Sequence, residues 1–394
     1  MNQEMIQHIV RAYKTPLYVF DIEVLLKRVQ YLKDSFPSRV SLCYAMKANP
    51  FLVQELDPFI EKFEVCSPGE YQICEEAGLS KEKLVISGVY KTPEVMEIML
   101  KQSNIGIYTI ESTQQFQLLA ELSNQSQQKI KLLLRLTSGN QFGLDESELE
   151  EILKIIPQFP YLYVQGIQYF SGTQKTSLKR LQREITYLDQ YMKKLNQMYQ
   201  FPIHELEYGP GFPVFYYQGE ESFDEEDFFE QFSTLLEQME YQGKVTLELG
   251  RSISASCGTY FTKVVDCKKN QGQNYAILDG GMHQLVYYGQ MMAMKKPCYQ
   301  LFPKREQGGE LWTLCGSLCT IHDLIVKQLP VGPLKIGDIF LFEKTGAYSM
   351  TEGISLFLSR DLPQVVFLKQ GTLTLIRGAI PTYSFNMSKQ ERMV

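Results

Sequence analysis

Lys47 is the residue whose type and position most directly indicate chemistry. It follows an apolar run at 41–45 that reads as a buried strand, and Asn49-Pro50 behind it favours a turn. A lysine at the end of such a strand holds its amine in a shielded site. Burial lowers the pKa of an amine, so that the neutral form can attack a carbonyl. The alternative is a lysine whose side chain reaches out to solvent, the usual fate of a single lysine.

Glycine turns and one acidic residue end two later apolar strands. Residues 209–212 read Gly-Pro-Gly-Phe, and residues 248–251 read Glu-Leu-Gly-Arg. Glycine lets backbone N–H groups approach phosphate oxygens, and Arg251 adds a charge-assisted contact, although a plain tight turn is the alternative. Glu248 on an apolar strand needs a proton or a cation as its partner. An amine, a phosphate cradle and a buried carboxylate together fit pyridoxal phosphate.

Alternating strands and helices must bring these residues together. Eight apolar strand patterns occur between residues 41 and 249, and seven of them are followed by a helical pattern. This alternation predicts a parallel sheet. Eight units in about 210 residues match a TIM-type (β/α)8 barrel, and a doubly wound open sheet is the alternative. In a barrel the reactive groups lie just past the carboxyl ends of the strands, where Lys47, Glu248 and the glycine turns stand.

The last third of the chain has a different pattern. From residue 252 onward helical patterns are few and strand-like runs are many, such as 260–265 and 338–342. We therefore predict an α/β protein with a barrel over residues 22–251 and a mainly β domain over residues 252–394. The N-terminal residues 1–21, with a strand-like run at 17–20, are expected to join the β domain.

Composition excludes several function classes. The 394 residues carry a net charge of −6 without a basic run, so the electrostatic footprint of nucleic-acid binding is missing. No apolar run approaches the roughly 20 residues of a membrane span, and no signal-peptide pattern begins the sequence. Eight scattered cysteines lack a Cys-x-x-Cys pair, and four histidines lack metal-ligand spacing. These features predict a cytoplasmic protein with reduced thiols and no protein-built metal site.

Eight motifs, in order along the chain, resemble those of one enzyme family. Tyr44-Ala45-Met46-Lys47-Ala48-Asn49 is similar to the YAxKAN lysine motif of the fold-type III pyridoxal-phosphate decarboxylases, the diaminopimelate and ornithine decarboxylase group. The other segments are similar to the family's KFG, GLHxHxGSQ, GGGF, EPGR, DAGM, CExxD and GAY, and stand at 141–143, 166–174, 209–212, 248–251, 279–282, 318–323 and 346–348. The resemblance covers most of the chain and implies the same barrel and β domain.

The resemblance also implies roles for individual residues. Lys47 would carry pyridoxal phosphate, Glu248 would keep the ring nitrogen protonated, and Phe170 would stack on the ring where the family has a histidine. Cys319, from a second subunit, would protonate the substrate carbon after carbon dioxide leaves; its alternative is a buried structural thiol. Substrate contacts would come from Thr320 and Asp323. The remaining cofactor contacts, mostly to the phosphate, would come from Thr173, Gly209, Gly211, Leu249, Gly250, Arg251 and Tyr348.

Departures from the family motifs narrow the substrate. The acidic residue that follows the cysteine in diaminopimelate decarboxylases is Thr320 here, and their arginine after DAGM is Tyr287. Pro210 replaces a glycine and removes an N–H donor. Diaminopimelate is therefore an unfavourable substrate. The segments 172–174, 281–283 and 319–320 are more similar to the butirosin-pathway branch, which acts on a glutamyl group on an acyl carrier protein. Siderophore-pathway decarboxylases are a second similar branch.

The sequence thus predicts a pyridoxal-phosphate-dependent decarboxylase of an L-amino acid or amino-acid conjugate, free or carrier-bound. Racemisation on the same fold is one alternative. A non-catalytic pyridoxal-phosphate carrier is another, although a carrier would need neither the β domain nor Cys319. The family implies a homodimer with shared active sites, and no nucleic-acid or membrane partner is expected. An apolar stretch that reads as interface or as core consists of Tyr287, Tyr288, Met291, Met292 and Met294.

Overall fold

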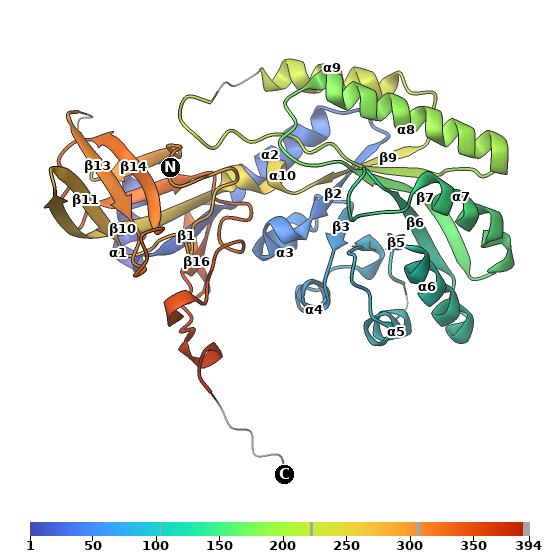
Figure 1. Cartoon of the computed structure of the whole chain (residues 1–394), viewed down its shortest axis with the longest axis horizontal. Coiled ribbons are helices and arrows are strands. Elements are labelled where there is room, and N and C mark those ends of the chain that lie inside the picture. The colour runs from blue at the N-terminus through green and yellow to red at the C-terminus, as the bar shows by residue number, and fades with distance from the viewer. Residues whose placement is uncertain (103, 221–223, 305–307, 389–394) are drawn as a thin grey trace, which may run out of the picture. The chain divides into compact units, whose positions relative to one another are not determined.

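The computed structural model describes residues 1–102, 104–220, 224–304 and 308–388, which divide into two units (Figure 1). The barrel unit consists of the described parts of Leu26–Val214 and Phe223–Ile253. The β unit consists of those of Met1–Leu25, Phe215–Ser222 and Ser254–Val394.

The barrel unit is a closed ring of parallel strands in chain order, which confirms the predicted (β/α)8 barrel. Cys43, Val85, Ile107 and Leu133, from four of these strands, form one buried apolar cluster. The strands are β2 (Val40–Ala45), β3 (Lys62–Val65), β4 (Leu84–Ile86), β5 (Ile107–Ile110), β6 (Ile130–Leu136), β7 (Leu162–Phe170), β8 (Glu205–Gly209) and β9 (Lys244–Leu249).

Capping residues begin the helices that surround the barrel. At α5 the Thr92 side chain accepts a hydrogen bond from the Val95 N–H and proline follows at the first helical position, a favoured start. The helix predicted from Pro50 to Phe63 is wrong. Residues 50–52 form a 3₁₀ turn and α3 is one turn long, because Pro58 has no N–H to continue the ladder. The helices are α2 (Ile22–Asp34), α3 (Val53–Leu56), α4 (Pro68–Glu76), α5 (Pro93–Lys101), α6 (Thr113–Ser126), α7 (Glu146–Ile155), α8 (Leu178–Tyr199), α9 (Glu225–Glu237) and α10 (Arg251–Ser254).

The β unit is built on a mixed sheet in the order β14-β13-β11-β10-β1-β16-β17; β15 also pairs with β10, and β12 pairs with β15. Strand β1 pairs antiparallel with β10 and parallel with β16, which confirms that the run at 17–20 joins this sheet. Helix α1 (Gln3–Ala12) packs Ile6 and Ile9 into the apolar core of the sheet. The strands are β1 (Leu17–Asp21), β10 (Gly258–Asn270), β11 (Gln273–Leu278), β12 (Tyr299–Phe302), β13 (Glu310–Cys315), β14 (Leu324–Val331), β15 (Ile339–Glu343), β16 (Gln364–Lys369) and β17 (Thr372–Arg377).

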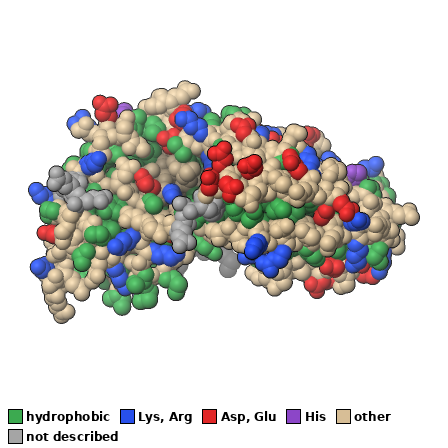
Figure 2. Space-filling model, turned by 90° about the horizontal axis from the view of Figure 1, so that it is seen from above, with side chains coloured by type: hydrophobic (Ala, Val, Ile, Leu, Met, Phe, Trp, Pro, Cys, Tyr) green, Lys and Arg blue, Asp and Glu red, His purple; other side chains and the backbone are tan. Residues whose placement is uncertain are grey.

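Three features of the described residues concern surface charge, the apolar character of the helices and clusters of candidate metal ligands. On the face drawn in Figure 2, Lys and Arg side chains form no continuous basic stripe. Among the described residues, none of the helices has both the length and the apolar character to cross a bilayer. In the same residues no group of three or more His, Cys, Asp or Glu side chains is arranged to hold a metal ion.

Candidate active site

Lys47 stands one turn beyond the carboxyl end of β2. The residues on either side of it, Met46 and Ala48, are buried in a 3₁₀ turn, and the Asn49 side chain accepts a hydrogen bond from the Phe51 N–H. The buried neighbours fix the backbone while the Lys47 side chain keeps 42% of its surface exposed. Its amine is therefore held at the barrel end and remains reachable, as a group that must react with an aldehyde requires.

Two buried glutamates flank the Lys47 amine. Strand β2 lies between β3 and β9, so Glu64 of β3 and Glu248 of β9 reach the amine from either side. Lys47 Nζ lies 2.5 Å from Glu64 Oε2 and 3.6 Å from Glu248 Oε1. Both carboxylates are almost fully buried, so water contributes little to their stabilisation.

The pKa values of these two carboxyl groups are shifted in opposite directions. Burial raises the pKa of Glu248, the nearby charge of Glu64 raises it further, and the Lys47 ammonium opposes both. Burial also acts to raise the pKa of Glu64, but the charge and hydrogen bond of Lys47 outweigh it and hold that pKa below its usual range. Glu64 is thus the ionised partner of Lys47. Glu248 takes up a proton more readily than Glu64 does, which suits a carboxyl group that shares a proton with a ring nitrogen.

A chain of buried polar side chains continues from Glu248 into the barrel. Gln168 Nε2 lies 2.7 Å from Glu207 Oε1 and 3.5 Å from Glu248 Oε2. Lys62 pairs with Glu205 and lies 4.0 Å from Glu207 Oε2. Burial raises the pKa of Glu207 to about 7, although Lys62 opposes the shift.

Sequence reasoning missed Glu64, Gln168 and Glu207. The sequence pattern that could have identified the two glutamates is an acidic residue inside an apolar strand, the same pattern that identified Glu248. It recurs in Phe63-Glu64-Val65 and in Leu206-Glu207-Tyr208.

Close packing of two loops explains the glycine turns. A Cβ added to Gly209 would lie 2.4 Å from Cδ2 of Phe170, its neighbour across β7 and β8. Gly211 has a φ of +62°, and a Cβ there would lie 2.1 Å from the Gly172 carbonyl oxygen. Only glycine leaves room at these two positions. They bring the loop that carries Thr173 against the turn at 209–212, as a phosphate cradle requires.

The segment that ends β9 completes this edge of the barrel. Leu249 is the last residue of β9, Gly250 follows, and the nearly buried Arg251 opens the short helix α10. The barrel therefore brings together Lys47, Glu248, the Phe170 loop, the glycine turn and Arg251. An amine, a proton-holding carboxyl and a cradle that side chains at 209 and 211 would fill are the features that pyridoxal phosphate needs, so the residues present fit this cofactor.

The other predicted site residues belong to the β unit. Cys319 and Thr320 lie in a loop at 316–323, where the Asp323 carboxylate accepts hydrogen bonds from the N–H groups of Met282 and Leu318, each at 2.8 Å. Cys319 itself is exposed, so the alternative of a buried structural thiol is wrong for the isolated chain. Asp323 is buried and its described contacts hold the loop together. Tyr348 has a φ of +64° in the turn after Gly346.

The apolar stretch after the DGGM turn divides between core and surface. Tyr287 is buried and donates a hydrogen bond to the Glu343 carbonyl at 2.6 Å, so it is core. Tyr288 is 44% exposed, and Met291, Met292 and Met294 are each more than 70% exposed. The core alternative is therefore wrong for these four residues, which form an apolar surface that we call the methionine patch.

Comparisons with known proteins agree with this geometry. The family model for the pyridoxal-binding domain of pyridoxal-dependent decarboxylases matches residues 22–255, more than half of the chain. A Staphylococcus aureus 2-[(L-alanin-3-ylcarbamoyl)methyl]-2-hydroxybutanedioate decarboxylase is 28% identical, over 90% of this chain and 94% of the relative. A Niallia circulans L-glutamyl-[BtrI acyl-carrier protein] decarboxylase is 25% identical, over 96% and 94%.

Solved structures show the same fold. The diaminopimelate decarboxylase of Helicobacter pylori, complexed with L-lysine, aligns with a TM-score of 0.84 at 23% identity, over 96% of this chain and 98% of that one. A matching family model, relatives aligned over nearly the whole chain and a barrel whose site fits the cofactor lead to one assignment. The chain belongs to the pyridoxal-dependent decarboxylase family and uses pyridoxal phosphate as its cofactor.

Proposed function

We propose that the substrate of this decarboxylase is an L-amino acid joined to a larger polar group, and that Lys47 carries the cofactor. The observation that carries the proposal is the Lys47 amine, held between Glu64 and Glu248 at the end of the barrel. The conjugated substrate is supported by the relatives, one acting on an alanin-3-yl conjugate of hydroxybutanedioate and one on a carrier-bound glutamyl group.

Different residues of the chain bind, orient and protonate the cofactor. When bound, pyridoxal phosphate draws electrons away from the substrate Cα, so that the α-carboxylate can leave as carbon dioxide. Lys47 supplies the amine that holds the cofactor and releases it to the substrate, and Glu64 keeps that amine oriented. Glu248 holds a proton at the ring nitrogen. Phe170 covers one face of the ring. The remaining cofactor contacts come from Thr173, Gly209, Gly211, Leu249, Gly250 and Arg251.

The proton that replaces the carboxylate comes from a second copy of the chain in this proposal. Cys319 is the donor because its thiol is exposed on a loop whose backbone is fixed. Asp323 contributes by holding that loop, Thr320 lies next to the substrate, and Tyr348 reaches the phosphate. A two-fold dimer then has two equivalent sites, each made by both copies. The methionine patch supports such an assembly, since exposed methionine and tyrosine side chains are enriched at interfaces.

A product assay tests the proposal. The holoenzyme is incubated with free L-amino acids, with meso-diaminopimelate and with amide-linked conjugates of diaminopropionate or glutamate. Mass spectrometry then measures the masses of the products. We expect loss of carbon dioxide from a conjugate, and a kcat/KM below about 10⁴ M⁻¹s⁻¹ for diaminopimelate. Tyr287 and Thr320 offer no charge to its distal groups. An inverted Cα with the carboxylate retained would instead indicate a racemase.

The predicted cytoplasmic location is also a proposal. The eight cysteines are free thiols, which supports a reducing compartment. Fractionation of cells that express the protein tests this location.

A further inference from the structure

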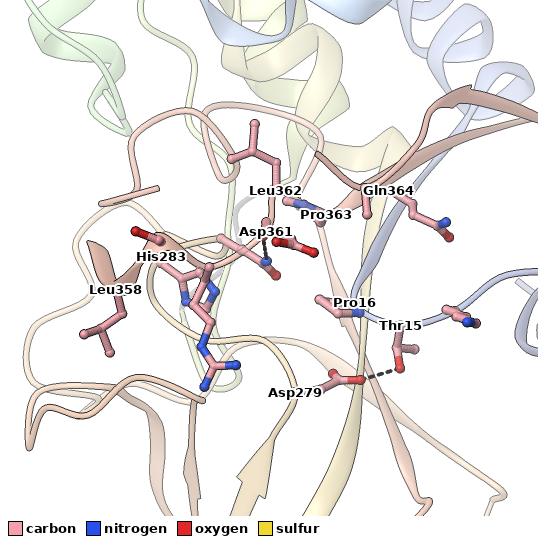
Figure 3. Close-up of a pocket in the computed structure, with 14 residues that line it drawn as sticks. Thr15, Pro16, Asp279, His283, Leu358, Asp361, Leu362, Pro363 and Gln364 are labelled. Carbon is pink, nitrogen blue, oxygen red and sulfur yellow. Dashed lines mark hydrogen bonds between the residues drawn. The ribbon is translucent and has the colours of Figure 1, made fainter. Parts of the chain in front are cut away.

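A cavity in the β unit stands next to the loop that carries Cys319. It has a volume of about 710 Å³ and is lined by segments around Thr15, His283 and Arg360 (Figure 3). This volume is that of a site for a small molecule. The family motifs assigned no role to Arg360 or to the N-terminal segment before β1, and the proposed function uses neither.

Several polar groups of this cavity lack either a hydrogen-bond partner or a counter-ion among the described residues. His283 is 1% exposed, and its Nδ1 atom makes no hydrogen bond within the part of the chain that the structure describes. The same holds for the buried Oε1 atom of Gln364. Lys14 and Arg360 also line the cavity, and among the described residues neither forms an ion pair. A cavity that keeps buried polar atoms unsatisfied is suited to a ligand that satisfies them.

The carboxylates of the cavity are not equivalent. Asp279 accepts hydrogen bonds from the hydroxyls of Thr15 and Thr262, at 2.5 and 2.8 Å, and from the Lys263 N–H at 2.9 Å, so its charge is already stabilised. Asp361 is exposed, and its carboxylate has no hydrogen-bond donor or ion pair among the described residues. The cations therefore remain available to an anionic group, while Asp361 and Gln364 accept from hydroxyl or amide groups of the same ligand.

The neutral form of His283 fits this arrangement. Burial, with a smaller contribution from the charge of Arg360, lowers the pKa of His283 to about 4. Near neutral pH the ring is therefore uncharged and can donate one N–H to an oxygen. It adds a hydrogen bond to the anion without competing with Arg360 for charge.

The cavity shares a wall with the Cys319 loop. Arg360 Nη2 donates to the Ser317 carbonyl at 2.7 Å, and the Ser317 N–H donates to the Gly280 carbonyl at 2.8 Å. Asp279 and His283 flank the segment that makes the second contact and also line the cavity. A molecule in the cavity thus lies beside the loop that, under the proposed function, completes the site of the other copy.

We propose that this cavity receives the distal part of the substrate, through a carboxylate that pairs with Arg360 and accepts a hydrogen bond from His283, while Lys14 adds a second positive charge to the cavity wall. The inference rests on the proposed function in one respect, namely that the Cys319 loop faces the reacting carbon. It places the substrate among conjugates whose far end carries a carboxylate and hydroxyl or amide groups. Arg360 is then a specificity-determining residue, and it substitutes for the charges missing at Thr320 and Tyr287.

Paired substrates test this assignment. One is an amide-linked conjugate of diaminopropionate that ends in a carboxylate, and the other is its carboxamide, which has the same shape without the charge. We expect the holoenzyme to prefer the carboxylate. In Arg360→Gln the KM for the carboxylate should rise roughly 10- to 100-fold, since a hydrogen-bonded charge pair is lost. In the same variant the preference for the carboxylate over the carboxamide should fall to within about twofold, whereas a loop disturbed by loss of the hydrogen bond to Ser317 would lower kcat for both substrates alike and leave the preference unchanged.

Two further variants separate a ligand contact from a structural effect. Lys14 has no contact with the Cys319 loop among the described residues. Lys14→Gln should therefore raise the KM for the carboxylate substrate, by a smaller factor than Arg360→Gln does. Lys269→Gln changes an exposed cation on the β10–β11 hairpin, outside the cavity, and should have no effect. Equal use of both substrates by the unaltered enzyme, or an unchanged preference in Arg360→Gln, would overturn the inference.

Calorimetry gives a readout that does not need turnover. The decarboxylated form of the carboxylate conjugate is titrated into the holoenzyme and into Arg360→Gln, and weaker binding to the variant supports the cavity. If neither conjugate is decarboxylated but binding still depends on Arg360, the proposed function fails and the cavity assignment stands. Equal affinity in both proteins overturns the assignment. Inorganic phosphate is titrated in parallel, and binding of phosphate without binding of the carboxylate overturns it as well.

Discussion

At the end of the barrel Lys47 lies between two buried glutamates, whereas in the β unit Cys319 is exposed on a loop held by Asp323. In the barrel, charged side chains are desolvated and fixed by one another, so their pKa values are set before any ligand arrives. In the β unit only the backbone is fixed, and the reactive thiol remains in solvent. The barrel half is thus preorganised for the cofactor, whereas under the proposed function the β half becomes part of a buried site only when another surface covers it.

The largest expected effect comes from removing the barrel amine. Lys47→Ala should lower kcat by at least about 10⁴-fold, because it removes the amine that Glu64 and Glu248 hold in position to bind the cofactor and exchange it with the substrate. Lys101→Ala, which removes an exposed cation paired with Glu97 on α5, is the matched control. Steady-state kinetics with a conjugated substrate gives the comparison. Near-normal turnover by Lys47→Ala would remove the barrel half from the mechanism.

Removing the thiol tests whether the two halves come from different copies. Cys319→Ala should lower kcat roughly 10²- to 10⁴-fold, the contribution of a positioned proton donor. When Cys319→Ala and Lys47→Ala are mixed and exchange subunits, about half of the dimers are mixed and about a quarter of all sites are intact. Activity should recover to about that fraction. A mixture that stays inactive after mass spectrometry has verified the exchange would show that each site belongs to one chain.

The buried acids of the barrel predict how its stability depends on pH. Burial raises the pKa of Glu207 from 4.5 to about 7. Between these values the folded chain keeps a proton that the unfolded chain has lost, so the contribution of Glu207 to stability falls as pH rises through this window. Glu207→Gln should remove that slope and raise the free energy of unfolding at pH 8 by at most about 3 kcal/mol.

Urea unfolding at pH 5 and at pH 8 measures this effect. Glu150→Gln on α7 is the matched control, because its pKa is shifted in the opposite direction, chiefly by its hydrogen bond to Lys194. If Glu207→Gln destabilised the fold more at pH 8 than at pH 5, a buried charged Glu207 would be the stabilising form and our description of the barrel interior would be incorrect.

The smallest expected effect concerns the surface that would cover the β half. Changing both Met291 and Met294 to lysine should raise the dimer dissociation constant about 10- to 100-fold, because apolar surface is replaced by charge. Met198→Lys on α8 makes the same change at a 60% exposed position of the barrel unit and should leave the dimer intact. Analytical ultracentrifugation measures both. An unchanged dissociation constant in the double variant would separate the methionine patch from the assembly.

The sequence predicted those parts of the molecule that repeat or that stand at strand ends. Eight alternating strands closed as expected, because apolar parallel strands must bury both faces. The tight turns at Gly209 and Gly211 were predictable because glycine itself indicates a turn at these positions. Glu64 and Glu207 carried the same local signal as Glu248 and were missed, whereas their contacts with Lys47 and Gln168 form only on barrel closure and no sequence pattern indicates them. The cavity at His283 and Arg360 is formed by segments that lie more than 70 residues apart in the sequence, so no local sequence pattern could predict it.

Cofactor attachment at Lys47 is the central claim, and one mapping experiment tests it most directly. The purified holoenzyme is reduced with borohydride, digested, and searched by mass spectrometry for a lysine that carries the pyridoxyl group. We predict a single modified peptide containing Lys47, and none in the Lys47→Ala variant. A stoichiometric adduct on any other lysine, such as the buried Lys62 or Lys91, would contradict the account.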